Sequence, residues 1–370
     1  MSVLYVSKAS RVLAHRDKLA ALAGRVALDV VVPERWGAAP DEGDDPRHPP
    51  LERVPARLHG HNHLHWYPGL GGVLDRMRPT LVHADEEPYS LVTLQVARLC
   101  ARRMIPFVYF AWQNLDKRLP PPFGRVRRYV YAHAAGGIAG TPAAARVLER
   151  SGWRGPTAVI AQMGVDPERF RPDAAARAAR REALGIPEET VVVGYVGRLI
   201  PAKAVDVFVD AVAAVRGLHA VVVGAGPEGK AMRWRAARSP AADRVAFTGA
   251  VPSADVPSWM AAFDVLVLPS RTTRLWAEQF GRVLVEAMAC GVPVVVSDSG
   301  EMAGVVGPAG RVFPQGDVRA LARTLADLSA DGAERGRLGA LGRARVLERF
   351  SQAAVAAATV DFYERLGVGR

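Results

Sequence analysis

Two carboxylates eight residues apart, Glu278 and Glu286, enclose a glycine turn in the segment Glu278-Gln279-Phe280-Gly281-Arg282. Gly281 permits a tight turn, and residues 282–289 have the apolar spacing of a helix that begins there. The first turn of a helix offers unpaired backbone N–H groups and the positive end of its dipole to an anion. Carboxylates beside such a site are suited to accept hydrogen bonds from sugar or ribose hydroxyls. In the alternative interpretation, Glu286 is an exposed helix residue without a ligand.

Two cations, Arg198 and Lys203, stand in a short loop that follows an apolar run. A guanidinium and an ammonium group together suit a diphosphate leaving group, because they offset the charge that develops on it. Cations in loops are usually only solvated. The chain, however, has only five lysines, at positions 8, 18, 117, 203 and 230, among far more arginines. A lysine at position 203 is therefore unusual for this chain, which favours a specific role for it.

A second small-residue turn, Gly224-Ala225-Gly226-Pro227, ends another apolar run. Small residues there allow the backbone to approach a nucleotide closely. Pro227 makes the segment unlike a dinucleotide-binding fingerprint, so by itself it indicates only a turn.

These residues need a regular framework, and the chain alternates short β-branched runs with amphipathic stretches rich in Ala, Leu and Arg. Such alternation is typical of βαβ units that build a parallel sheet. In the first half we expect strands at residues 3–6, 28–32, 81–83, 107–110, 137–139 and 158–160. In the second half we expect strands at residues 191–196, 220–223, 244–247, 265–268, 293–296 and 310–313. The two comparable sets predict an α/β protein of two Rossmann-like, doubly wound domains.

The expected domain boundary lies at residues 163–172, where glycine and two prolines interrupt both periodicities. We expect a first domain at residues 1–163, a hinge at 164–172, a second domain at 173–350 and a C-terminal segment at 351–370. Residues 33–50 are acidic and rich in Pro and Gly, so they are expected to form a surface loop.

Ligands of doubly wound sheets bind beyond the carboxyl ends of the strands. In the first half this rule nominates residues 7–11, 85–87, 112–114 and Thr141. In the second half it nominates residues 197–203, 224–226, 248–249, 270–274 and 297–300.

The composition is that of an ordinary folded protein, with 49% hydrophobic and 23% charged residues over 370 positions. Two distant cysteines, Cys100 and Cys290, suit a reducing compartment and are expected to be buried and inert. No apolar run reaches the roughly 18 residues of a membrane span and no leader is evident, so we expect a cytoplasmic protein.

The net charge of +11 admits an anionic partner, either a negatively charged acceptor or the inner face of an anionic membrane. The preferred explanation is an arginine-rich coding bias, with cations spread along the chain. No nucleic-acid-binding module is recognised and aromatic residues make up 7% of the chain, which disfavours a nucleic-acid partner.

Residues 197–203, the Glu278/Glu286 pair and the following Ala289-Cys290-Gly291-Val292-Pro293-Val294-Val295 together resemble the retaining glycosyltransferases of family 4, which have the GT-B fold. Gly164-Val165-Asp166 and Phe170 also resemble the family's interdomain segment. The resemblance is specific over the second half of the chain and only architectural over the first half.

This resemblance implies a nucleotide-sugar donor site with Glu278, Arg198 and Lys203 at the reacting centre. Arg198 and Lys203 would hold the diphosphate, Glu278 the sugar hydroxyls and Glu286 the ribose. Backbone amides would come from Phe280, Gly281 and Arg282, and the base would be surrounded by Gly224, Gly226, Thr248 and Gly249. The family mechanism is front-face substitution with retention, in which the leaving diphosphate helps to deprotonate the acceptor. Neither a metal nor another cofactor is then expected.

The chain departs from the family pattern mainly in the first half. Ser7-Lys8-Ala9-Ser10-Arg11 replaces a glycine pair, and Trp112 or Gln113 stands where many members have a histidine. Ala204 follows the lysine instead of glycine, and Met163 replaces the asparagine of the interdomain segment. The acceptor is therefore left open, with these candidate contacts: Ser7, Lys8, Ser10, Arg11, Asp85, Glu86, Glu87, Trp112, Gln113 and Asn114.

Three further features have open interpretations. Residues 85–87 either contact acceptor hydroxyls or supply an auxiliary base, or else form a solvated loop with a capping carboxylate. His59, His61, His63 and His65 would share one face of a strand, where lining the acceptor side is favoured over zinc. An amphipathic helix at residues 353–366 is expected to cross back onto the first domain, the alternative being an ordinary helix of the second.

The predicted function is therefore transfer of a sugar from a nucleotide donor to an unidentified glycan, lipid or natural product. The alternatives are a nucleotide-sugar epimerase or phosphorylase of the same fold, a basic nucleic-acid-binding protein, and an inactive sugar-nucleotide sensor. The base, the sugar, the acceptor and the oligomeric state are not specified by the sequence.

Overall fold

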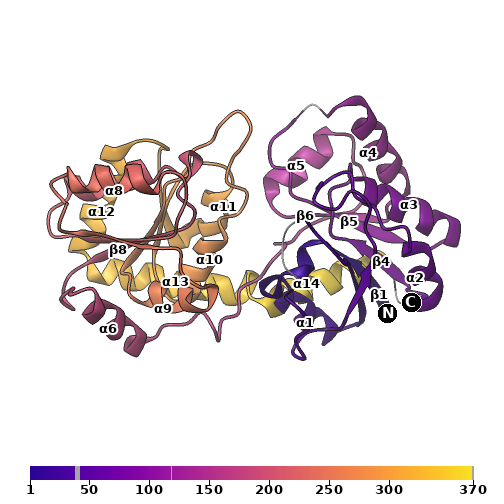
Figure 1. Ribbon diagram of the computed structural model, residues 1–370, viewed down its shortest axis with the longest axis horizontal. Helices are drawn as coiled ribbons and strands as arrows, with labels where there is room; N and C mark the ends of the chain where they lie inside the picture. The colour runs from indigo at the N-terminus through magenta and orange to yellow at the C-terminus, as the bar shows by residue number, and fades with distance from the viewer. Residues whose placement is uncertain (38–41, 118, 369–370) are drawn as a thin grey trace. The chain divides into compact units, whose positions relative to one another are not determined.

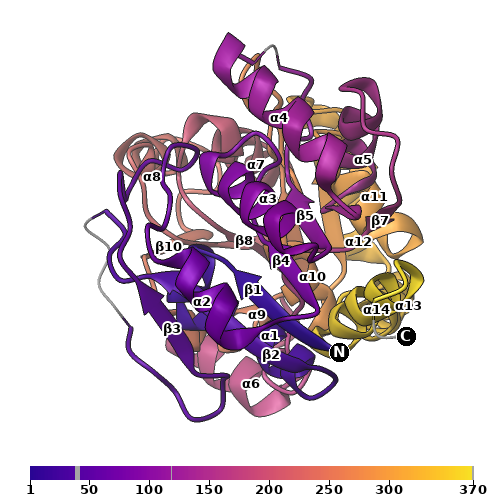
Figure 2. The same cartoon turned by 90° about the vertical axis from the view of Figure 1, so that its right-hand side faces the viewer.

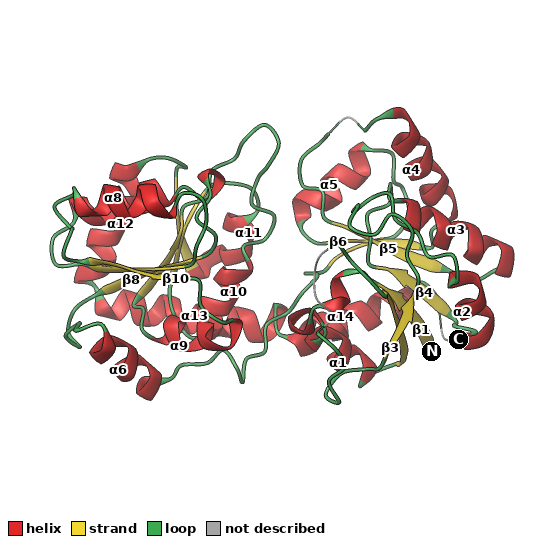
Figure 3. Cartoon of the chain, in the orientation of Figure 1, coloured by secondary structure: helices red, strands yellow, loops and turns green. Residues whose placement is uncertain are grey.

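The computed structural model describes residues 1–37, 42–117 and 119–368, and it divides into two compact units. The first unit comprises Met1–Gly164 with the chain from Gln352 onward, and the second comprises Val165–Ser351. Figure 1 labels their elements along the chain, and Figure 3 distinguishes the helices from the strands.

The first unit is built on a seven-stranded sheet in the order β3-β2-β1-β4-β5-β6-β7, with every neighbouring pair parallel. Its strands are β1 (Ser2–Val6), β2 (Ala27–Pro33), β3 (Leu51–Val54), β4 (Leu81–Ala84), β5 (Phe107–Ala111), β6 (Gly136–Ala139) and β7 (Thr157–Val159). Its helices are η1 (Ala9–Arg11), η2 (Leu13–His15), α1 (Asp17–Ala23), α2 (Leu70–Met77), α3 (Leu91–Arg103), α4 (Pro121–His133), α5 (Pro142–Arg150) and α14 (Gln352–Arg365).

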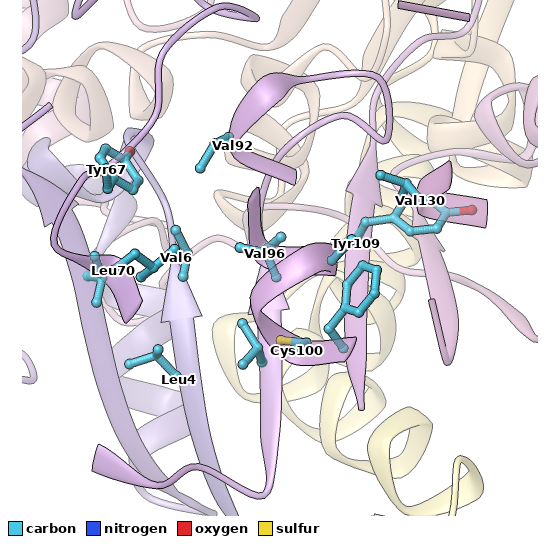
Figure 4. Packing of buried hydrophobic residues seen from close by; sticks show 14 of the residues in the cluster. Leu4, Val6, Tyr67, Leu70, Val92, Val96, Cys100, Tyr109 and Val130 are labelled. Atoms are coloured by element: carbon cyan, nitrogen blue, oxygen red, sulfur yellow. The ribbon is translucent and has the colours of Figure 1, made fainter. Parts of the chain in front are cut away.

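Helices cover both faces of this sheet, which is why β4 and β5 are continuous buried runs without polar alternation. Figure 4 shows Leu4 and Val6 of β1 packed near Leu70, Val96 and Cys100 of the helices on one face. On the other face α1 packs against α14. The rigid core thus holds the carboxyl ends of β1, β4 and β5 side by side.

The second unit has a six-stranded parallel sheet in the order β10-β9-β8-β11-β12-β13. Its strands are β8 (Val192–Val196), β9 (His219–Val223), β10 (Val245–Gly249), β11 (Val265–Leu268), β12 (Val294–Ser297) and β13 (Gly310–Phe313). Its helices are α6 (Ala174–Ala183), η3 (Pro201–Lys203), α7 (Val205–Ala214), α8 (Gly229–Ala237), η4 (Ser253–Asp255), α9 (Val256–Ala261), α10 (Arg282–Ala289), α11 (Met302–Val306), η5 (Gly307–Ala309), α12 (Val318–Ala330) and α13 (Gly332–Arg349).

The predicted fold of two doubly wound parallel sheets is confirmed, and each of the twelve expected strands overlaps an observed one. Strand β3 was not predicted. Its sequence, Leu51-Glu52-Arg53-Val54, has two charged residues in the middle because β3 is an edge strand and only Val54 is buried. Of residues 33–50, predicted as a surface loop, Pro33 ends β2 and residues 34–50 connect β2 to β3, with residues 38–41 outside the described part.

The chain passes from one unit to the other twice, between Gly164 and Val165 and between Ser351 and Gln352. Within the first unit the Gln352 side-chain amide donates to the Gly164 carbonyl at 3.0 Å, and within the second the Val165 N–H donates to the Phe350 carbonyl at 2.8 Å. The two passages therefore run side by side. Of the expected hinge at 164–172, residues 165–172 belong to the second unit.

The C-terminal helix α14 belongs to the first unit, to which the chain crosses back. Tyr363 of α14 and His83 of β4 are both buried and form a hydrogen bond between the tyrosine hydroxyl and Nδ1. Burial lowers the pKa of His83 to about 3, so this ring is neutral.

The two cysteines, Cys100 and Cys290, are free and buried, as predicted. Burial raises the pKa of both thiols to about 12, which disfavours the reactive thiolate. Over the described residues, none of the helices has the length and apolar character needed to span a membrane.

Candidate active site

The strand order reverses between β1 and β4 in the first sheet and between β8 and β11 in the second. Such switch points leave a crevice beyond the carboxyl ends of the two strands, because the connections on either side run away from each other. The loops that begin at Ser7, Asp85, Gly197 and Pro269 lie at these four strand ends.

In the first unit, Ser7 after β1 and Asp85 after β4 meet in a buried hydrogen bond of 2.8 Å from Oγ to Oδ2. Gln162 donates to the other Asp85 oxygen at 2.9 Å, and Lys18 Nζ lies 4.0 Å from it. Burial opposes ionisation of Asp85, yet Lys18 and these two donors hold the pKa of its carboxyl below the usual value. The buried, ionised carboxylate of Asp85 thus links the loop after β1 to the loop after β4.

The neighbouring carboxylate, Glu86, is also buried and forms an ion pair with Lys8 through Oε2. Its other oxygen, Oε1, lies 3.7 Å from Nε2 of His65. Burial raises the pKa of Glu86 to about 7 and lowers that of His65 to about 4. The Lys8 side chain is one-fifth exposed, whereas the side chains of Glu86 and His65 are almost fully buried.

The third carboxylate, Glu87, joins the loop after β4 to the loop after β5. Its Oε1 accepts hydrogen bonds from the backbone N–H groups of Trp112 and Gln113, at 2.8 and 2.9 Å. Burial raises the pKa of Glu87 to about 7, against the effect of these two donors. The structure therefore brings three predicted segments together at the carboxyl ends of β1, β4 and β5, as predicted: residues 7–8, 85–87 and 112–114.

The contacts of Ser10 and Arg11 favour a structural role over acceptor binding. Both are buried, and the Arg11 guanidinium donates to the carbonyls of Pro33, at 2.7 Å, and Glu34. The Ser10 carbonyl accepts from Arg16 Nε at 2.7 Å. These bonds fold the β1–α1 loop against the end of β2.

The predicted shared face of His59, His61, His63 and His65 is wrong, because residues 58–65 form turns instead of a strand. His59 and His61 are exposed, His63 is half-buried and His65 is fully buried. His63 Nδ1 lies 3.0 Å from Ser90 Oγ. Among the described residues, no group of three or more His, Cys, Asp or Glu side chains is placed to hold a metal ion.

In the second unit, Lys203 at the end of η3 forms an ion pair with Glu278 through Oε2. Ser270, which follows β11, donates to the same oxygen at 3.0 Å. The Lys203 ammonium lies 5.4 Å from the centre of the Trp276 ring. The side chains of Lys203 and Glu278 are 16% and 11% exposed, so each keeps a path to a ligand.

Gly281 is the N-cap residue of helix α10 and has the left-handed conformation φ 70°, ψ 64°. A Cβ atom there would lie 2.8 Å from Leu284 Cδ1 and 3.0 Å from Leu268 Cδ2, so any other residue would add crowding against two buried leucines to the strain of the left-handed backbone. Arg282 forms an ion pair of 2.9 Å with Glu286 one turn on. Burial raises the pKa of Glu286, while Arg282 and Arg169 oppose that effect.

The predicted glycine turn after β9 packs against the loop after β8. Gly224 donates to the Gly249 carbonyl at 2.8 Å, and Leu199 donates to the Ala225 carbonyl at 3.0 Å. A Cβ at Gly224 would lie 1.9 Å from the Gly197 carbonyl oxygen, and one at Gly226 would lie 2.3 Å from that of Leu199. Thr248 and Gly249 lie within the end of β10, and Arg198 is exposed.

Several residues of these clusters were not among the predicted site residues: Lys18, Gln162, Arg169 and Trp276. Lysine scarcity was a usable signal for Lys18, whereas Ser270 was nominated by its position after a strand and His65 by the histidine alternation. Gln162 and Arg169 carry no local signal, because only tertiary packing brings them to Asp85 and Glu286.

Two family models match this chain, one over most of each unit. The family model described as Glycosyltransferase Family 4 matches residues 16–169, and the one described as Glycosyl transferases group 1 matches residues 190–331. The chain belongs to glycosyltransferase family 4.

Curated relatives of this family 4 chain include a GDP-mannose-dependent alpha-(1-6)-phosphatidylinositol monomannoside mannosyltransferase of Mycolicibacterium smegmatis. It is 35% identical over 206 residues, which are 53% of this chain and 54% of the relative. A D-inositol 3-phosphate glycosyltransferase of Streptomyces bingchenggensis is 36% identical over 55% of this chain and 47% of its own length. A 2-deoxystreptamine N-acetyl-D-glucosaminyltransferase of Streptomyces fradiae is 36% identical over 51% of this chain and 45% of its own. The matched part spans about half the length of these relatives.

Solved structures share the fold of the family 4 chain over its whole length. Anabaena HepE in complex with UDP has a TM-score of 0.79 at 23% identity and covers 99% of this chain and 100% of its own. Sucrose-phosphate synthase of Thermosynechococcus elongatus has a TM-score of 0.73 at 21% identity and covers 100% of both chains. These similarities confirm the GT-B fold.

Proposed function

We propose that this chain transfers a sugar from a nucleoside-diphosphate sugar to a hydroxyl-bearing acceptor, with retention of the anomeric configuration. The observation that carries the proposal is the contact of Glu278 with both Lys203 and Ser270, next to the beginning of helix α10. It gathers a cation, a carboxylate and free helix N–H groups in one unit, which are the groups that a sugar diphosphate needs.

Lys203 is suited to hold Glu278 and a phosphate oxygen at the same time. An ammonium group has three donors, and the pair with Glu278 uses one of them. We assign the remaining donors of Lys203, together with the exposed guanidinium of Arg198, to the diphosphate. Both cations would then offset the charge that develops when the bond to the sugar breaks.

Glu278 has one oxygen that accepts from both Lys203 and Ser270. We assign its second oxygen to hydroxyl groups of the donor sugar, because carboxylates are strong acceptors for O–H donors. Glu286 is assigned to the ribose hydroxyls. Its ion pair with Arg282 opposes the rise in the pKa of Glu286 that burial causes, and the ionised carboxylate accepts the stronger hydrogen bonds.

The proposed reaction is a front-face substitution. The bond from the anomeric carbon to the diphosphate oxygen breaks, and a bond to the acceptor oxygen forms on the same face of the sugar. The acceptor proton passes to the leaving diphosphate, so no protein base is required. Arg198 and Lys203 supply positive charge at the diphosphate, and we therefore propose that transfer needs no metal ion.

The relatives guide the choice of donor and acceptor. One is named for GDP-mannose, and HepE was crystallised with UDP, so GDP and UDP sugars are the first donors to test. The named acceptors are a phosphatidylinositol monomannoside, D-inositol 3-phosphate and 2-deoxystreptamine. Inositol and 2-deoxystreptamine are both six-membered carbocyclic polyols, and we propose this acceptor class for the present chain.

Thermal shift with UDP, GDP, ADP and TDP would first identify the base. The sugar nucleotides of that base would then be incubated with inositol, inositol phosphate and 2-deoxystreptamine, and NMR would compare the anomeric configuration of donor and product. An inverted product would disprove retention. Sugar turnover without any acceptor would favour an epimerase, and turnover that depends on inorganic phosphate would favour a phosphorylase.

A further inference from the structure

A pocket on the first unit lies between the loop after β5, the first turns of α4 and the end of α5. Its volume is about 520 Å³, within the usual range for small-molecule sites. Five cationic side chains line it, from Lys117, Arg125, Arg127, Arg128 and Arg150, against one carboxylate, Asp116. Figure 2 shows α4 and α5 on the face of this unit that is turned to the viewer.

The charge of this region comes from missing acids instead of added bases. Residues 88–148 contain nine Lys or Arg residues and one acidic residue, so 61 positions carry +8 of the total charge of +11. Basic residues occur there at about one in seven positions and elsewhere at about one in eight, as 9 of 61 and 39 of 309. Acidic residues number 1 in those 61 positions and 36 in the other 309.

An arginine-rich coding bias does not explain this pattern, because it would add cations without removing acids. The cations are spread along the chain, as predicted, but the acidic residues are not, and this uneven distribution of acids makes the net charge local. A local excess of positive charge raises the concentration of anions at the surface that carries it.

The arginines of the pocket also have donors to offer. Arg127 Nε is buried without a hydrogen-bond partner among the described residues, and its guanidinium lies 6.0 Å from the Tyr131 ring centre. Arg125 and Arg128 are exposed and three positions apart on α4, which places them on the same side of the helix. The ion pair of Asp116 with Arg150, at 3.4 Å, joins two side chains that are more than half exposed, so a ligand can compete with it.

We propose that this pocket binds a phosphate-bearing group. Guanidinium forks match the geometry of phosphate oxygens, and several of them around one cavity suit a doubly charged phosphate better than a carboxylate. The loop after β5 carries Trp112–Asn114 at one end and Asp116 and Lys117 at the other, so an occupant of the pocket touches the loop that also reaches Glu87. This proposal stands apart from sugar transfer, because it concerns binding to the first unit alone.

The test compares the wild type with the double variant Arg125→Glu/Arg128→Glu and with a charge-matched control, Arg25→Glu/Arg216→Glu, which reverses two exposed arginines outside the pocket. The ligands are glycerol 3-phosphate, measured by calorimetry, and vesicles of phosphatidylcholine with or without phosphatidylglycerol, measured by cosedimentation. Thermal unfolding and UDP or GDP affinity verify that each variant is folded and that its second unit is intact. If the pocket variant unfolds, Arg125→Gln/Arg128→Gln replaces it.

The wild type and the control should bind the phosphate ligand, with an affinity that falls as sodium chloride is raised, and the pocket variant should bind at least about tenfold more weakly. Binding of glycerol 3-phosphate identifies a free phosphate ester as sufficient, whereas binding only to phosphatidylglycerol vesicles identifies a lipid headgroup. Equal affinity of the pocket variant and the control, or no binding of either ligand by the wild type, would overturn the proposal. If the wild type binds the phosphate ligand but neither UDP nor GDP, the result would count against the proposed function and leave the proposal for this pocket unaffected.

Discussion

Glu86 Oε1 lies 3.7 Å from His65 Nε2, and both atoms are buried without a hydrogen-bond partner among the described residues. His65 Nδ1 faces the His61 carbonyl at 3.3 Å, so the proton of the neutral ring belongs on Nδ1 and Nε2 presents a lone pair. A lone pair facing a carboxylate is repulsive, whereas a protonated Glu86 would donate to it. The raised pKa of Glu86 and the lowered pKa of His65 both favour this neutral pair, in which Glu86 Oε2 still accepts the hydrogen bond from Lys8.

The two groups give opposite slopes of stability against pH. Glu86 titrates at about 7 in the fold and near 4.5 when unfolded, so the folded state holds the proton longer and stability falls as pH rises between these values. His65 titrates at about 4 in the fold and near 6.5 when unfolded, so stability rises with pH over that window.

Glu86→Gln should remove the contribution of Glu86 to stability, which falls as pH rises. The unfolding free energy of the variant, relative to wild type, should therefore increase between pH 4.5 and 7, by at most about 3 kcal/mol. Urea denaturation at a series of pH values measures this difference, and His65→Gln should change it in the opposite direction between pH 4 and 6.5. Parallel profiles for wild type and Glu86→Gln would show that Glu86 ionises normally.

Lys203→Ala should weaken binding of the preferred nucleoside diphosphate on the order of 1–3 kcal/mol, because one charge-assisted contact is lost. Glu286→Ala should weaken it by a similar amount through the ribose. Calorimetry measures both, with Arg319→Ala as the control that removes an exposed cation of α12 in the same unit. Unchanged affinity in both site variants would disprove the donor-site assignment.

Gly281→Ala should destabilise the protein more than the same substitution at a left-handed glycine that has open space around it. Gly316 is a matched control, since its φ of 81° is close to the 70° of Gly281 and a Cβ there meets nothing within 4 Å. Gly316→Ala should cost about 1–2 kcal/mol for the conformation alone. Gly281→Ala should cost about 1–3 kcal/mol more, from the contacts with Leu268 and Leu284. Equal midpoints of chemical denaturation would contradict the steric argument.

Tyr363→Phe should cost about 1–3 kcal/mol, because it leaves the buried Nδ1 of His83 without its partner from α14. Tyr131→Phe is the comparison. Its partner, Ser151 Oγ, keeps a second bond of 2.9 Å to the Leu148 carbonyl, so a smaller loss is expected. Thermal unfolding of the two variants provides the measurement, and an equal loss would argue against a special role for the His83 contact.

The strands of both sheets and the helix after Gly281 were predictable from the sequence because their signals are local. Buried parallel strands are continuous apolar runs, and the turn at Gly281 sits between residues whose spacing already marks a helix. Strand β3 was not predicted because an edge strand with exposed charges lacks a continuous apolar run.

The first unit was less predictable because its site depends on packing between distant segments. Arginine is a residue type that often contacts ligands, yet the guanidinium of Arg11 donates its hydrogen bonds to the carbonyls of Pro33 and Glu34. Lys18 and Gln162 reach Asp85 only after the sheet has formed. The histidine alternation suggested a strand, but Gly60 adopts a φ of 87° and the chain turns there instead.

The scarcity of lysine has a practical consequence for chemical footprinting. Three of the five ammonium groups, those of Lys8, Lys18 and Lys203, lie beside a buried carboxylate of a candidate site, whereas Lys117 and Lys230 are exposed. Acetylation followed by mass spectrometry would therefore yield few modified peptides, each attributable to one position. A ligand that shields Lys203 but not Lys8 would report on the second unit alone, so the occupancy of each half can be followed on the unmutated protein.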